Sequence, residues 1–159
     1  PSATTPSPSA GAGAQGVPTD TRTASATRDP IRVTTDLFIA DIDPVGGDIV
    51  RLQLLNHKDP VETARDFVLF TPEFHYAAQS GLIGTGLPNH KTPFTFEGER
   101  NVKLADGQDA VSVTLTAPGP DGVKVTKTLT FRRGSYLIDV TQQVANPTQA
   151  PLAAHAYFQ

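Results

Sequence analysis

The chain has 159 residues, with 13 basic and 16 acidic side chains and a formal net charge of −3 at pH 7. A mildly acidic chain without a basic run is a poor candidate for binding nucleic acid. It contains no cysteine, which excludes disulfide frameworks, thiolate metal sites and cysteine nucleophiles. No apolar run approaches the roughly 18 residues that a membrane-spanning helix needs, so we expect this segment itself to be soluble.

Residues 1–30 differ in composition from the rest of the chain. Pro, Ser, Ala, Thr and Gly make up 24 of these 30 residues, and Val17 is the only larger aliphatic side chain. Such a segment buries too little apolar surface to offset the entropy that ordering would remove. We therefore predict a disordered, semi-flexible linker over residues 1–30 and one folded domain over residues 31–159.

Alternation of apolar and polar side chains predicts strands at the start of this domain. Residues 31–39 are predicted to form one strand, with apolar side chains at Ile31, Val33, Leu37 and Ile39. Residues 43–47 break this strand, because they include a proline and two adjacent glycines. A second strand is then predicted from the alternation at residues 50–54.

The middle of the chain is less regular. Residues 66–70 are a short apolar run, which is consistent with a strand buried on both faces. Residues 61–65 have room for at most one helical turn. From residue 71 to residue 93 prolines and glycines recur, so we expect a long loop that holds one short strand near residues 74–78.

The last third shows the clearest hairpin. Val111, Val113 and Leu115 alternate with polar residues, residues 118–122 predict a turn, and a return strand follows. In that strand Val123, Val125, Leu129 and Phe131 are assigned to one face, and Lys124, Thr126, Thr128 and Thr130 to the other. A turn at Gly134, with a positive φ, leads to a strand from Tyr136. A turn at residues 146–149 then precedes a last strand at 152–158.

Many short strands separated by Gly/Pro turns predict an all-β fold, namely an antiparallel β-sandwich. Phe94 and Phe96 flank Thr95 in an alternating pattern that suits the core of such a sandwich better than a sugar-binding platform. The sequence ends at Gln159 inside a predicted strand, so we expect the sandwich to be truncated at its C-terminal end.

Few residues suggest a chemistry. The four histidines, His57, His75, His90 and His155, show no metal-ligand spacing, and we predict no metal, no cofactor and no catalytic residue. His57 and His90 stand among turn residues and are predicted to be solvated. Glu73, His75 and Tyr76 are the candidates for lining a ligand cleft, although a strand with His75 outward and Phe74 and Tyr76 inward explains the same pattern.

Three segments carry a resemblance to a known family. They are Gly46-Gly47-Asp48-Ile49, then Tyr76-Ala77-Ala78-Gln79-Ser80-Gly81-Leu82-Ile83-Gly84, then Phe131-Arg132-Arg133-Gly134-Ser135-Tyr136 leading into Ile138-Asp139-Val140. In this order they resemble the large periplasmic domain of the YidC/Oxa family of membrane protein insertases. From the residues themselves, Gly46-Gly47 is expected to make a tight reversal, and Gln79 and Ser80 to satisfy backbone groups of a loop.

The resemblance, which covers residues 31–159, implies a large twisted supersandwich similar to sugar-binding and mutarotase-like domains. It implies a multi-pass parent protein in the Gram-negative inner membrane, with this domain on the periplasmic face. The implied role is non-enzymatic: support of membrane protein insertion through contact with the Sec translocon (SecDF and SecYEG) or with nascent membrane proteins. The insertase groove belongs to the membrane core of the family, so no insertase residue is assigned here.

Two alternatives remain at this stage. One is a carbohydrate-binding or mutarotase-like domain that uses His75 and Glu73. The other is a secreted adhesion module without membrane spans on either side.

Overall fold

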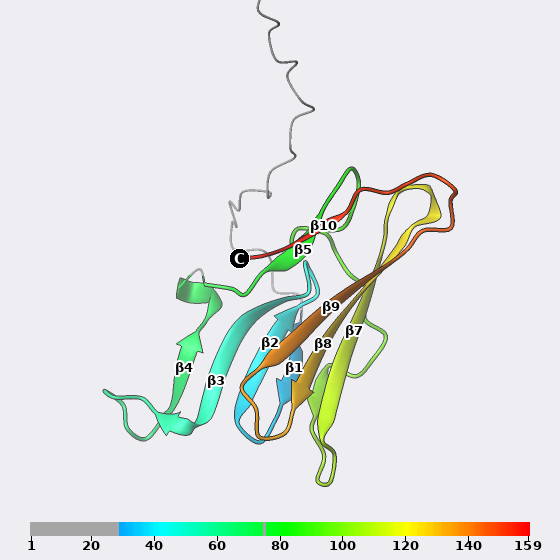
Figure 1. The fold of residues 1–159 in the computed structure, drawn as a ribbon. Helices are drawn as coiled ribbons and strands as arrows, with labels where there is room; N and C mark the ends of the chain where they lie inside the picture. Colours follow the sequence, from blue (N-terminus) through cyan, green and yellow to red (C-terminus); the bar gives the residue numbers. More distant parts are fainter. Residues whose placement is uncertain (1–28, 75) are drawn as a thin grey trace, which may run out of the picture.

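The computed structural model describes residues 29–74 and 76–159, and its regular structure is almost all β (Figure 1). The strands are β1 (Ile31–Thr34), β2 (Phe38–Asp43), β3 (Asp48–Lys58), β4 (Asp66–Phe70), β5 (Ser80–Ile83), β6 (Asn101–Lys103), β7 (Ala110–Pro118), β8 (Lys124–Arg132), β9 (Ile138–Ala145) and β10 (His155–Phe158). The described residues also form two 3-10 helices, η1 (Pro72–Phe74) and η2 (Pro120–Gly122). No helix in these ranges is long and apolar enough to cross a bilayer.

The strands form three sheets. The largest has the order β4-β3-β2-β1-β6, the second is the meander β7-β8-β9, and the third is a two-stranded ribbon of β5 and β10. Pairing is antiparallel throughout the described strands except between β1 and β6, which run parallel. The prediction of an all-β, mainly antiparallel architecture is confirmed.

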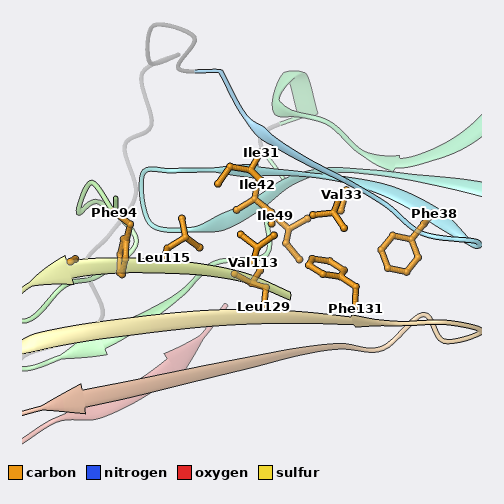
Figure 2. Close-up of a cluster of buried hydrophobic side chains, with 12 residues drawn as sticks. Ile31, Val33, Phe38, Ile42, Ile49, Phe94, Val113, Leu115, Leu129 and Phe131 are labelled. Carbon is orange, nitrogen blue, oxygen red and sulfur yellow. The ribbon is translucent and has the colours of Figure 1, made fainter. Parts of the chain in front are cut away.

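One core joins the two larger sheets. Figure 2 shows its side chains between β1 to β3 on one side and β7 and β8 on the other. Phe38 and Phe131 are the largest apolar side chains that are fully buried in it, and their ring centroids lie 6.2 Å apart. Phe94, from the loop before β6, is also buried here, and Phe96 packs against the cluster. The assignment of these two phenylalanines to the core is therefore correct.

The first predicted strand is wrong in one respect, because residues 31–39 contain two strands. The Oγ1 of Thr35 accepts hydrogen bonds from the backbone N–H groups of Leu37 and Phe38, at 3.1 and 3.0 Å, and so closes a tight turn. The turn changes which side chains face inward: Phe38, Ala40 and Ile42 are buried in β2, while Leu37 and Ile39 are only partly buried. The hydrogen bonds to the Thr35 hydroxyl therefore end the first strand, although the apolar–polar alternation of the sequence continues.

The middle segment also departs from the expectations. β4 forms as predicted, but it is an edge strand whose Leu69 is 53% exposed, so it is not buried on both faces. The short strand expected near residues 74–78 lies instead at β5, after η1. Residues 61–65 hold one hydrogen-bonded turn, from Arg65 N–H to Glu62 O, and no helix.

The C-terminal meander follows the prediction closely. β7 and β8 pair over nine residues each, and β9 continues the sheet. Gly134, between β8 and β9, has a φ of +68°, as its turn required. Gly46 and Gly47 have φ values of +80° and +64° and make the reversal between β2 and β3. The linker predicted for the first residues lies outside the described residues and stays a prediction.

Candidate functional site

An apolar groove of about 180 Å³ lies between the two larger sheets, where β3 and β4 face β8 and β9. Ile49, Leu52 and Phe70 line it from the first sheet, and Leu129, Ile138 and Val140 line it from the second. Among the described residues that line the groove, none carries a charge. The groove is therefore suited to apolar side chains.

Large apolar side chains are exposed at the mouth of this groove. Tyr136, Leu137 and Phe158 all line it, and they are 48%, 65% and 70% exposed. Tyr136 is held in place by stacking on Phe38, with ring centroids 6.2 Å apart, and by an edge contact with His57. Contiguous exposed apolar side chains of this size mark contact surfaces more often than they occur by chance on a solvated face.

A strand edge runs beside the same groove. β9 is the last strand of its sheet and pairs only with β8 in the part of the chain that the structure describes. Its other side presents backbone groups that an added strand can pair with. An apolar groove next to an open edge is the arrangement that binds an extended segment by backbone pairing plus side-chain insertion.

A buried charge pair lies next to Ser80, which lines the groove. Lys127 of β8 and Asp48 of β3 have side chains that are 1% and 0% exposed, and the Nζ lies 3.6 Å from Oδ1. The Nζ also donates to the backbone oxygens of Gly46, at 2.7 Å, and Ser80, at 3.0 Å. The same Asp48 oxygen accepts the backbone N–H of Ser80 at 3.3 Å. These contacts bring all three sheets together at one point.

Burial shapes the acid–base properties of this cluster. Loss of water around Lys127 lowers the pKa of its ammonium to about 8, although the carboxylate of Asp48 opposes that shift. At neutral pH the Lys127 side chain is thus still charged and can donate to all three oxygens.

The histidine predicted to be solvated at position 90 is buried, so that prediction is wrong. His90 is 1% exposed, and its Nδ1 lies 2.5 Å from the hydroxyl of Tyr157. The loop that carries it folds back on β5, where Leu82 N–H donates to Pro88 O at 3.1 Å. Glycine at position 81 makes room for Tyr157, because a Cβ there would lie 2.5 Å from the tyrosine oxygen. His57 is exposed, as predicted.

Two of the three proposed ligand-cleft residues, Glu73 and Tyr76, do not line the groove. Glu73 stands exposed in η1, and Tyr76 is 71% exposed. The expectation that Tyr76 packs inward is therefore wrong, while His75 lies outside the described residues. The ligand role of these residues and the sugar-binding alternative stay predictions that no observation here tests. No cluster of three metal-ligating side chains occurs within residues 29–74 and 76–159.

The sequence analysis missed Lys127, although the alternation of β8 contains the signal. Val125, Leu129 and Phe131 are buried, and position 127 has the same parity, so a lysine there must point inward. The roles expected of Gln79 and Ser80 are only partly seen. The Gln79 side chain accepts from the Gln159 amide at 2.7 Å, and Ser80 begins β5 and uses its backbone rather than its hydroxyl.

Comparison with known proteins gives the family of the chain. Residues 30–159 match the family model described as the YidC periplasmic domain. The chain is 45% identical over 156 residues to the membrane protein insertase YidC of Dechloromonas aromatica, which covers 97% of this chain and 28% of that protein. It is 50% identical over 130 residues to the YidC of Aromatoleum aromaticum, covering 80% of this chain and 23% of that protein.

A further relative gives the same picture over the whole chain. The YidC of a Janthinobacterium species is 42% identical over 163 residues, covering 100% of this chain and 28% of that protein. This chain thus spans about a quarter of the length of these relatives. They are insertases rather than enzymes, and the family description places the matched region in the periplasm. The resemblance inferred from the three sequence segments is confirmed: the chain belongs to the YidC family, and its residues 30–159 belong to the periplasmic domain of that family.

Proposed function

We propose that this chain is the accessory interaction domain of a YidC-type insertase, and that it contacts a protein partner through the apolar groove and the open edge of β9. The observation that carries the proposal is the exposure of Tyr136, Leu137 and Phe158 at the mouth of an uncharged groove beside that edge. Together these features present both backbone groups and an apolar pocket to one extended segment.

The partners follow from the family. An insertase acts on membrane proteins, so the first partner class is a nascent membrane protein segment that is apolar and extended. The second class is a component of the Sec translocon, SecDF or SecYEG. Both classes offer the apolar side chains that the groove accepts, and the absence of charge among its lining residues disfavours a strongly charged partner.

The test uses the full-length insertase in its membrane. A photo-crosslinking amino acid replaces Leu137 at the groove mouth, and a matched control replaces Val61, which is 87% exposed but lies in the connection between β3 and β4. We expect position 137 to give adducts with a Sec component or a nascent membrane protein, and position 61 to give none.

Two results would overturn the proposal. Equal adduct yields from positions 137 and 61 would mean that the groove has no preference for a partner. An adduct from position 137 to a later part of the same insertase chain would mean that the protein covers its own groove.

A further inference from the structure

We propose that Lys127 is a positioning residue that fastens the ribbon of β5 and β10 onto the two larger sheets and so holds the end wall of the apolar groove. The ribbon supplies Ser80 and Phe158 to the groove lining, while Gly47 of the β2–β3 turn lies beside them. Lys127 binds the backbone on both sides of this junction. The inference concerns the shape of the groove and does not depend on what occupies it.

The ribbon needs such an attachment. A two-stranded ribbon is at best marginally stable by itself in water. β5 and β10 pair over only four residues each, and their own small cluster contains Leu82 and Leu87 packed against Val123 and Val125 of the hairpin. The position of the ribbon therefore depends on its contacts with the larger sheets. The strongest hydrogen bonds among these are the charge-assisted ones from Ser80 to Lys127 and Asp48.

Lys127 and Asp48 engage Ser80 from both sides. The ammonium donates to the carbonyl oxygen of Ser80, and the carboxylate accepts its N–H. The third contact, to Gly46 O, ties the same ammonium to the turn between β2 and β3. The Lys127–Asp48 pair thereby satisfies backbone groups of Ser80 in β5 and of Gly46 in the β2–β3 turn. β5 belongs to a different sheet from β2 and β3.

The packing around the side chain leaves little freedom for an alternative. A Cβ at Gly47 would lie 3.1 Å from Cδ of Lys127, so the glycine lets the lysine stem pass close to the turn. Leu115, which pairs with Lys127 across β7 and β8, also lies near Gly47, at 3.4 Å from such a Cβ. The apolar stem of Lys127 is thus packed close to the turn while its ammonium reaches the backbone oxygens.

Other connections to the ribbon are weaker. Gln142 of β9 donates from Nε2 to Gly81 O at 3.3 Å, and Ile49 forms an isolated bridge with Ala78 just before β5. These neutral hydrogen bonds are each individually weaker than a charge-assisted one. Removal of the Lys127 amino group, which donates to both backbone oxygens, is therefore expected to loosen the ribbon more than the sheets that it joins.

The test is amide hydrogen exchange on the full-length insertase, compared strand by strand. In Lys127→Met, amides of β5 and β10 should exchange at least about a hundredfold faster, because removing one partner of a buried charge pair is strongly destabilising. Amides of β7 and β8 should change much less. Leu129→Ala is the matched control: it opens a cavity two residues along the same strand and should not single out β5 and β10.

A second, milder variant tests the same contact in case Lys127→Met does not fold. Asp48→Asn keeps the size of the side chain and an oxygen to accept the Ser80 N–H, while it removes the negative charge beside Lys127. It should raise exchange in the same two strands by a smaller factor. Uniform acceleration across all strands in both variants, or acceleration in β5 and β10 that Leu129→Ala reproduces, would overturn the inference. Because exchange needs no partner, this result is independent of the crosslinking experiment.

Discussion

The backbone N–H and the ring Nδ1 of His90 both meet the hydroxyl of Tyr157, at 3.1 and 2.5 Å, although 67 residues separate the two in the chain. The rings lie edge to face with centroids 5.9 Å apart. This contact joins the loop after β5 to the strand β10. It lies close to Asp48, because a Cβ at Gly46 would come 2.5 Å from the His90 carbonyl oxygen and 2.7 Å from Asp48 Oδ2. Burial raises the pKa of the Tyr157 hydroxyl, the hydrogen bond from the His90 backbone opposes that shift, and the charge of Asp48 adds to it.

Replacement of Tyr157 by phenylalanine should lower the free energy of unfolding by about 1 to 2 kcal/mol. The ring and its packing remain, but two hydrogen bonds to a buried histidine are lost. Denaturant unfolding of the periplasmic part of the insertase measures the change. Tyr76→Phe is the control, because that side chain is 71% exposed and should behave like the wild type. Equal stability of Tyr157→Phe and Tyr76→Phe would contradict the importance of this contact.

Gly134→Val should lower the melting temperature. Gly134 has a φ of +68°, and nothing lies within 4 Å of the position that a Cβ would take, so the penalty comes from the backbone alone. A left-handed conformation costs a residue with a side chain roughly 1 to 2 kcal/mol, and more for a β-branched one. Gly134→Asn should be milder, because asparagine tolerates this conformation best after glycine. An unchanged melting temperature for the valine variant would refute the explanation.

The buried lysine also predicts a pH dependence. The pKa of Lys127 is about 8 in the folded protein and 10.5 for an ordinary lysine, so between these values the unfolded chain binds more protons than the folded one. Folding stability from this group therefore rises with pH in that window, because the penalty for a buried charge disappears. The free energy of unfolding of Lys127→Met should therefore fall further below that of the wild type between pH 8 and pH 10, by up to about 1.4 kcal/mol per pH unit.

Urea unfolding of both proteins at several pH values measures that deficit. Subtracting the variant from the wild type cancels the titration of groups that both proteins share. A deficit that stays constant or shrinks above pH 8 would show that the lysine does not lose its proton at an unusually low pH.

The sequence predicts the C-terminal meander well, for a physical reason. Val113 and Val125 belong to long runs with strict period 2, separated by a turn with glycine and proline, and β7 and β8 are neighbours in the chain. Local pattern and local pairing therefore agree. The turn at Thr35 is different, because one hydroxyl bonded to two backbone N–H groups interrupts a run that still alternates.

Elements that depend on distant partners could not be predicted. β6 is three residues long and exists because Val102 pairs in parallel with Val33, about 70 residues earlier. The burial of His90 depends on Tyr157 in the same way. The groove has no sequence signature either, since Phe70 and Val140 come from different sheets and only the packing of those sheets brings them together. Lys127 is the exception, because its parity in β8 places it inward.

The residues that fasten this fold come from its last third, and this has a consequence for how the chain acquires its structure. Lys127 reaches back 81 residues to Gly46 and 47 residues to Ser80. When the chain emerges during synthesis, N-terminus first, β1 to β4 appear before β7 and β8, whose side chains cover the apolar inner face of the first sheet. Long-range pairings of this kind form slowly. This part of the periplasmic domain should therefore be most prone to aggregation while β1 to β4 have emerged and β7 to β9 have not.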